Sequence, residues 1–151
     1  MKLYWPIIPL FVGAFSCTES THSSVSLPVQ GTWRLISATV VTKGDSVTTD
    51  YTKGTGMIKI INESHFAFLR HDENTPKDSS NHFDAGGGRY TIEGNTYTEH
   101  LDFYANKNWE GNTFHFTISV NNDTLVQKGK EKVESENVDR EIIEKYVRVS
   151  P

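Results

Sequence analysis

The chain has 151 residues, of which 36% are hydrophobic and 11% aromatic, and its formal net charge is −4. This length and apolar content suit one folded domain and argue against a wholly disordered chain. The acidic balance argues against a nucleic-acid partner, because such proteins present a concentrated positive surface. The one basic cluster, residues 128–132, is interrupted by Glu131.

The N-terminus has the order of features found in export signals. Lys2 supplies a positive charge, residues 3–15 form an apolar run too short to span a bilayer, and the small Ser16 ends it. Cys17 follows, and the whole order resembles a bacterial lipoprotein signal, in which this cysteine becomes the acylated first residue. A cleaved secretory signal with an incidental cysteine and an uncleaved hydrophobic tail are the alternatives.

We therefore divide the chain into a signal peptide of the lipoprotein type (residues 1–16), a flexible tether (17–30) and a barrel domain (31–151). Residues 18–26 are mostly small and polar, as in flexible tethers. Cys17 is the only cysteine, so no internal disulfide can form. Acylation there would hold the protein at a membrane of the bacterial cell envelope, on its periplasmic or its surface side.

From Gly31 onward, short runs rich in β-branched and aromatic residues alternate with glycine, asparagine and aspartate turns. The pattern predicts strands over residues 32–42, 56–61, 65–71, 88–93, 96–104, 113–120 and 124–130. Residues 47–51 are a short strand or the return of a loop. Residues 72–84 form the longest polar break, and long loops of this kind are either functional or mobile.

The last segment, residues 141–149, is ambiguous. Ile142 and Tyr146 have helical spacing, whereas Ile143 and Val149 fall on one face of a strand. We predict a strand, because the sheet otherwise lacks a partner that could close against its first strand.

About eight strands joined mostly by hairpins make antiparallel neighbours. Closure into an up-and-down barrel removes the open edges of such a sheet, and eight strands leave room for one small ligand. The predicted fold class is therefore all-β, an antiparallel up-and-down barrel.

Gly31, Thr32 and Trp33 stand at the start of the first predicted strand. They resemble the Gly-x-Trp signature of the lipocalins and the wider calycin group, which includes small lipocalin-like domains on bacterial exported proteins. In that family a basic residue near the end of the last strand packs across the tryptophan, and Arg148 holds the matching place. The resemblance implies structural roles for Gly31, Trp33 and Arg148 in closing the base of the barrel.

Period-2 alternation predicts which side chains face the interior. Along residues 113–120 it places Phe114 and Phe116 inside and His115 outside. Along residues 96–104 it places four side chains inside: Tyr97, Glu99, Leu101 and Phe103.

Glu99 would lose hydration among these aromatic rings unless a hydrogen-bond donor faces it. Gln127 and Arg89 are its possible partners. The alternative is that Glu99 lies near a strand end and is solvated.

We predict that six side chains line an apolar pocket: Tyr90, Tyr97, Leu101, Phe103, Phe114 and Phe116. Glu99 and Gln127 would fix the polar end of the ligand, as in many ligand sites. The predicted function is binding of a small hydrophobic or amphipathic molecule by a membrane-anchored barrel, without a cofactor. Two other classes stay open: a small-barrel isomerase or lyase that uses Glu99 as acid or base, and an interaction module with a filled barrel.

The six histidines do not predict a metal site. His65 and His71 share a strand face but lie roughly 20 Å apart at about 3.3 Å per residue. No histidine pair has the spacing of a zinc helix or knuckle.

The glycine triplet at residues 86–88 is followed by a predicted strand, whereas a phosphate-binding loop needs a helix. We therefore expect these glycines to allow a sharp bend, a bulge or a close approach of two backbones.

Overall fold

The structure is a computed structural model that describes residue 1 and residues 27–74, 76 and 82–150. The expected signal peptide, Cys17 and most of the expected tether lie outside the described residues. Within the described part of the chain, no helix is long and apolar enough to cross a membrane.

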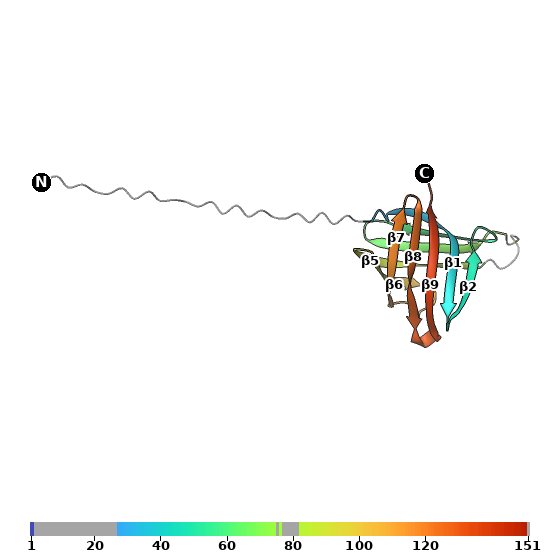
Figure 1. The fold of residues 1–151 in the computed structure, drawn as a ribbon. Coiled ribbons are helices and arrows are strands. Elements are labelled where there is room, and N and C mark those ends of the chain that lie inside the picture. Colours follow the sequence, from blue (N-terminus) through green and yellow to red (C-terminus); the bar gives the residue numbers. More distant parts are fainter. Residues whose placement is uncertain (2–26, 75, 77–81, 151) are drawn as a thin grey trace.

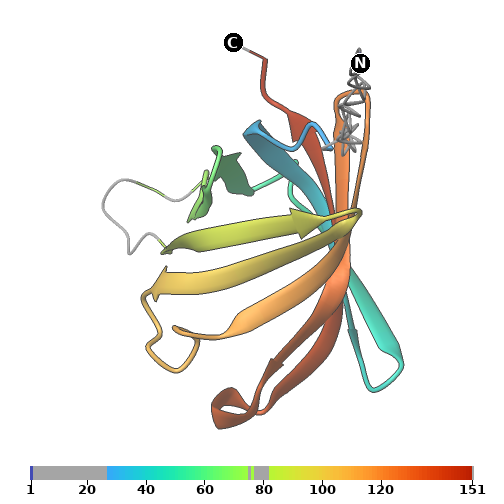
Figure 2. The same cartoon turned by 90° about the vertical axis from the view of Figure 1, so that its left-hand side faces the viewer.

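Within the described residues, nine strands form one antiparallel sheet that closes on itself as an eight-stranded barrel (Figures 1 and 2). The strands are β1 Gly31–Thr42, β2 Asp45–Asp50, β3 Thr55–Ile61, β4 His65–Asp72, β5 Phe83–Glu93, β6 Thr96–Tyr104, β7 Thr113–Asn121, β8 Thr124–Val133 and β9 Val138–Arg148, and a 3-10 helix, η1, covers Glu134–Glu136. From β3 to β9 each strand pairs with the next along the chain, and β1 pairs with both β3 and β9. The predicted all-β up-and-down barrel is confirmed.

The ninth strand, β2, lies outside the closed circuit. β1 uses Gly31 to Arg34 to pair with β3 and its residues from Ser37 onward to pair with β2. Every residue of β2 is exposed, so this strand extends a hairpin beyond the barrel wall. The short strand that residues 47–51 allowed is therefore present.

The final segment is a strand, as predicted, and it closes the barrel. β9 pairs with β1 from Trp33 opposite Arg148 to Val41 opposite Glu141. Its buried face carries Ile142 and Tyr146, which are 6% and 0% exposed. The strand face that carries Ile143 is the outer one. Both faces of this segment contain branched apolar residues, so the sequence pattern alone does not show which face is inward.

The base of the barrel is closed around Trp33, which is completely buried. Its indole Nε1–H donates a hydrogen bond to the carbonyl oxygen of Val29 at 2.7 Å. The Arg148 guanidinium lies over the indole, 4.0 Å from the ring centroid, and donates to the carbonyl oxygens of Gln30 and Pro28. Residues 27–30 therefore belong to the folded body, although the sequence places them in the tether.

Gly31 permits this closure. Its φ of +134° is a conformation that side-chain-bearing residues rarely adopt, and a Cβ there would meet Arg148 Nη1 at 2.6 Å. The glycine therefore leaves the space through which Arg148 reaches the tryptophan.

A β-bulge at the glycine triplet changes which side chains of β6 face inward. The register between β5 and β6 shifts between Gly87 and Gly88, so that Leu101 pairs with Gly88 and Phe103 with Gly87. A Cβ on Gly88 would overlap the His100 carbonyl oxygen, as expected for a close approach of two backbones. Leu101 is buried, whereas Phe103 is 69% exposed on the outer surface. The predicted inward placement of Phe103 is wrong, because the bulge reverses the alternation.

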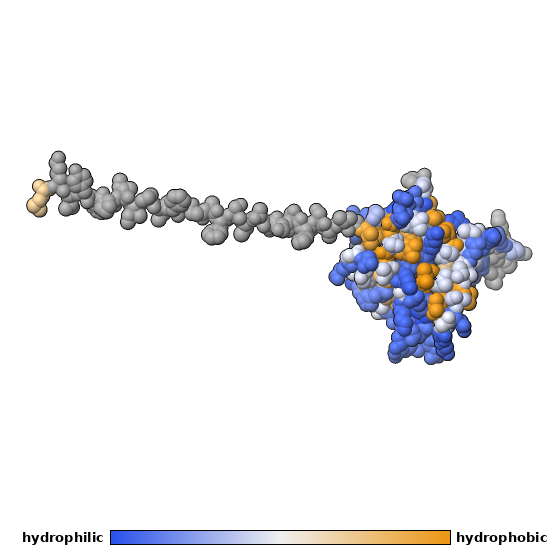
Figure 3. Space-filling model, in the orientation of Figure 1, coloured by the Kyte–Doolittle hydropathy of each residue, from blue (hydrophilic) through white to orange (hydrophobic). Residues whose placement is uncertain are grey.

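The outer surface differs in character around the barrel. Lys128 pairs with Glu141 at 3.2 Å and Lys130 with Asp139 at 3.1 Å, which makes the β8–β9 hairpin strongly hydrophilic (Figure 3). On β5 and β6, by contrast, Phe83 joins Phe103 as an exposed aromatic residue.

Candidate functional site

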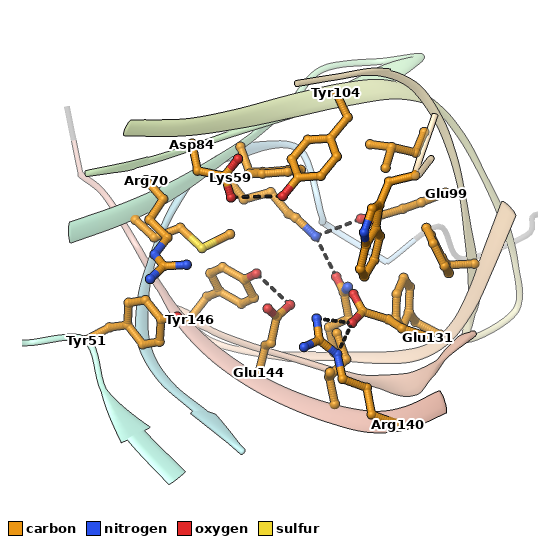
Figure 4. A pocket seen from close by; sticks show the side chains of 18 residues that line it. Tyr51, Lys59, Arg70, Asp84, Glu99, Tyr104, Glu131, Arg140, Glu144 and Tyr146 are labelled. Atoms are coloured by element: carbon orange, nitrogen blue, oxygen red, sulfur yellow. Dashed lines mark hydrogen bonds and ion pairs between the residues drawn. The ribbon is translucent and has the colours of Figure 1, made fainter. Parts of the chain in front are cut away.

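The barrel encloses a cavity of about 190 Å³ between its buried core and its open end (Figure 4). The wall combines aromatic and aliphatic side chains with seven ionisable acidic or basic ones: Lys59, Arg70, Asp84, Glu99, Glu131, Arg140 and Glu144. The interior is therefore neither filled nor apolar. Its volume is below the roughly 300–1,000 Å³ of drug-sized sites, which restricts any occupant to a small molecule.

The cavity wall includes a buried lysine on β3. Lys59 is 3% exposed, and its Nζ donates to Glu99 Oε1 on β6 at 2.7 Å and to Gln127 Oε1 on β8 at 2.9 Å. The rings of Phe66 and Tyr146 lie within 6 Å of the same nitrogen. A buried ammonium needs such partners, because removing either ion of a buried pair leaves an uncompensated charge.

This pairing revises the expected partners of Glu99. Gln127 does belong to the cluster, but its amide oxygen accepts a hydrogen bond from Lys59. Arg89, the other candidate, forms an ion pair with Asp102 on the outer surface. Glu99 is thus the counter-ion of Lys59, and its use as a catalytic acid or base stays a hypothesis.

A carboxyl and a phenol lie together on the β9 wall. The Tyr146 hydroxyl donates to Glu144 Oε2 at 2.8 Å. Burial raises the pKa of the Glu144 carboxyl above its ordinary value, and burial together with the Glu144 charge raises the pKa of the Tyr146 hydroxyl. The phenol therefore stays protonated and acts as the donor of this hydrogen bond.

The open end of the cavity is formed by ion pairs and aromatic rings. Arg140 Nη2 lies 2.6 Å from Glu131 Oε2, and its guanidinium carbon is 5.7 Å from the ring centroid of Trp109. The Tyr104 hydroxyl donates to Asp84 Oδ2 at 3.0 Å, and burial, reinforced by this hydrogen bond, raises the pKa of Tyr104 to about 12.

The structure brings five of the eight predicted ligand-binding residues onto the cavity wall: Glu99, Leu101, Phe114, Phe116 and Gln127. Tyr97 is not on the cavity wall, because its side chain is completely buried in the closed core. Tyr90 faces inward at the base end of β5, where its ring packs on Tyr97 and its hydroxyl donates to the Asn62 carbonyl oxygen. Phe103 lies outside. The ligand-binding role of all eight stays a prediction.

Sequence reasoning missed most of the charged wall. Lys59 is the one charged residue in an otherwise apolar run, residues 56–61. Because polar and apolar residues do not alternate in this run, the sequence does not predict which of its side chains face inward. The β8–β9 hairpin offered a better signal, because its register sets Gln127 opposite Glu144 and Glu131 opposite Arg140. Opposite charges on directly facing positions of an antiparallel pair indicate one shared face.

No group of three or more potential metal ligands occurs among the residues that the structure describes.

The closed antiparallel barrel with its tryptophan base has a lipocalin-like fold. The model of a family described as a domain of unknown function, DUF4488, matches residues 28–151, and the chain belongs to that family.

Among solved structures, the chain is similar to a lipocalin-like protein from Bacteroides uniformis ATCC 8492. The two are 14% identical with a TM-score of 0.48, and the match covers 80% of this chain and 97% of the other. A search of curated proteins found no match.

Proposed function

We propose that the protein binds a small amphipathic molecule inside the barrel. The observation that supports this proposal is the cavity itself, which lies inside a barrel closed at its base by Trp33 and is lined by both aromatic rings and ionised groups. An interaction module with a filled barrel would have no such space. The charged wall replaces the expected apolar pocket, so the proposed ligand is compact and partly polar.

The test is to fill the cavity and compare binding with a matched control on the same strand. Ile142 lines the cavity, whereas its neighbour Ile143 faces outward. We expect small molecules that co-purify with the protein, or that raise its melting temperature, to be lost in Ile142→Trp and retained in Ile143→Trp. Native mass spectrometry and thermal unfolding measure both effects.

Binding that persists in a folded Ile142→Trp variant would contradict the proposal. So would the failure of every small acidic, basic and neutral compound to bind the unmodified protein.

We further propose that the protein is exported and anchored in the bacterial envelope through acylated Cys17. The support is the order of the charged start, the short apolar run, Ser16 and Cys17. Metabolic labelling with a fatty-acid analogue should mark the unmodified protein and Ser20→Ala but not Cys17→Ser. Membrane retention of an unlabelled Cys17→Ser protein would contradict acylation as the anchor.

A further inference from the structure

Arg70 on β4 differs from the other charged residues of the cavity wall. Its guanidinium makes no hydrogen bond or ion pair with any residue that the structure describes, and its Nε is fully buried without a partner. Arg70 lines the cavity, on the side that also carries Asp84 and Tyr51 (Figure 4). A buried guanidinium N–H without an acceptor is destabilising, and such groups are rare in folded proteins.

Each of the other ionised groups on the described wall has a partner within the protein. Lys59 is bonded to Glu99 and Gln127, and Arg140 is bonded to Glu131. The remaining two carboxylates each accept a hydrogen bond from a tyrosine hydroxyl: Asp84 from Tyr104 and Glu144 from Tyr146. Arg70 is therefore the cation of this wall that is free to take an acceptor from outside the chain.

The residue best placed to compete for Arg70 is Asp84, its direct cross-strand neighbour on β5. Facing residues of opposite charge usually pair. Here the Asp84 carboxylate is bonded to Tyr104 instead, and no ion pair joins it to Arg70 within 4.0 Å. Arg70 therefore lines the cavity with guanidinium donors that no described side chain of the wall accepts from.

We propose that Arg70 binds an acidic group, a carboxylate or a phosphate, of the small molecule that occupies the cavity. This inference rests on the proposed binding function and specifies the ligand class. A guanidinium fork matches two oxygens of either anion, and the resulting charge-assisted hydrogen bonds are among the strongest in proteins. Met57 and Phe68, which line the same cavity, provide apolar surface for the body of the ligand.

The test uses benzoate and phenyl phosphate as acidic probes, with benzyl alcohol and benzylammonium as neutral and cationic probes of similar size. Isothermal titration calorimetry on the purified full-length protein should show at least one acid binding about tenfold or more tightly than the alcohol. Whether benzoate or phenyl phosphate binds better distinguishes the two anions.

Variants separate a binding role from a structural one. Arg70→Gln should remove the preference for acids, whereas Asp84→Asn should strengthen acid binding because it removes the competing carboxylate. Arg89→Gln, on the outer surface, should change neither. If Arg70→Gln does not fold, Arg70→Lys supplies the test: a lysine keeps the charge but loses the fork, so acids should bind more weakly yet still better than the alcohol.

The outcomes are distinguishable. If benzyl alcohol or benzylammonium binds as tightly as both acids, or if Arg70→Gln keeps the preference, this inference is wrong while the binding function stands. If none of the four probes binds, both proposals are contradicted.

Discussion

The two ends of the barrel use similar residue types in opposite ways. At the base, Trp33 and Arg148 direct their donors to backbone carbonyl oxygens of residues 28–30, and the indole is completely buried. In the cavity, the donors and acceptors are side chains that reach across open space, and Arg70 has no partner in the described chain.

This difference separates stability from binding. A cluster whose hydrogen bonds all end on the protein's own backbone stabilises the fold and leaves no free donor for a ligand. A cluster with an open donor beside a cavity loses some stability and keeps the capacity to bind.

Trp33→Ala should cause the largest loss of stability, about 3–5 kcal/mol, because it empties the closed base. Denaturant unfolding followed by circular dichroism measures it. Trp109→Ala is the matched control, since Trp109 is a half-buried residue at the open end, and it should lose less than half as much. Equal losses would contradict the contrast between the two ends.

Lys59→Met should come next, with a loss of at most about 3–5 kcal/mol, because it leaves Glu99 as an unpaired buried charge. Uptake of a proton by the carboxylate limits the effect. The double variant Lys59→Met/Glu99→Leu should recover most of the loss in urea unfolding. A double variant no more stable than the single one would show that the pair does not act as a unit.

Arg148→Ala should lose about 1–3 kcal/mol, since it removes two charged hydrogen bonds and the contact with the indole. Arg89→Ala removes an exposed ion pair with Asp102 and should change the free energy of unfolding by less than about 1 kcal/mol. The melting temperatures of the two variants provide the comparison, and a similar decrease in both would count against a special role of the base.

The smallest effect should be a change in pH dependence on replacing Glu144 by Gln. Because folding raises the Glu144 pKa, the folded state holds this proton more tightly than the unfolded state. The unmodified protein should therefore lose stability relative to Glu144→Gln as the pH rises from about 4.5, the ordinary value for this carboxyl.

The difference should level off once Glu144 is ionised in the folded protein. Urea unfolding at a series of pH values measures it, with the exposed Glu93→Gln as control. If the unmodified protein instead gained stability relative to Glu144→Gln as the pH rises, the assigned direction of the Glu144 pKa shift would be wrong.

Where the chain repeats a simple period or motif, the structure could be predicted. The regular alternation of β7 correctly placed Phe114 and Phe116, and the Gly-x-Trp motif correctly located the closed base. Phe103 was misplaced because a single bulge at Asp102, opposite Gly87 and Gly88, reverses the facing of later residues of β6, and alternation does not locate such a bulge.

The charged cluster could not be predicted for a different reason. Lys59 and Glu99 are 40 positions apart in the chain, and they meet only because the closed sheet brings β3 and β6 to opposite sides of one interior. Local sequence patterns do not show which distant residues will be in contact. The same holds for Arg70, whose significance depends on a missing partner.

The pairing of β1 with β9 has a consequence for how the molecule is made. The seam joins Trp33 to Arg148, so the ring remains an open ribbon until the last strand has left the ribosome and, if exported, the translocation channel. Until β9 pairs, β1 and β8 each have an unpaired backbone edge, and such edges can pair with other chains and cause aggregation. A chaperone that shields nascent chains would have its greatest value in that interval, and a stop codon before β9 would make the hazard permanent.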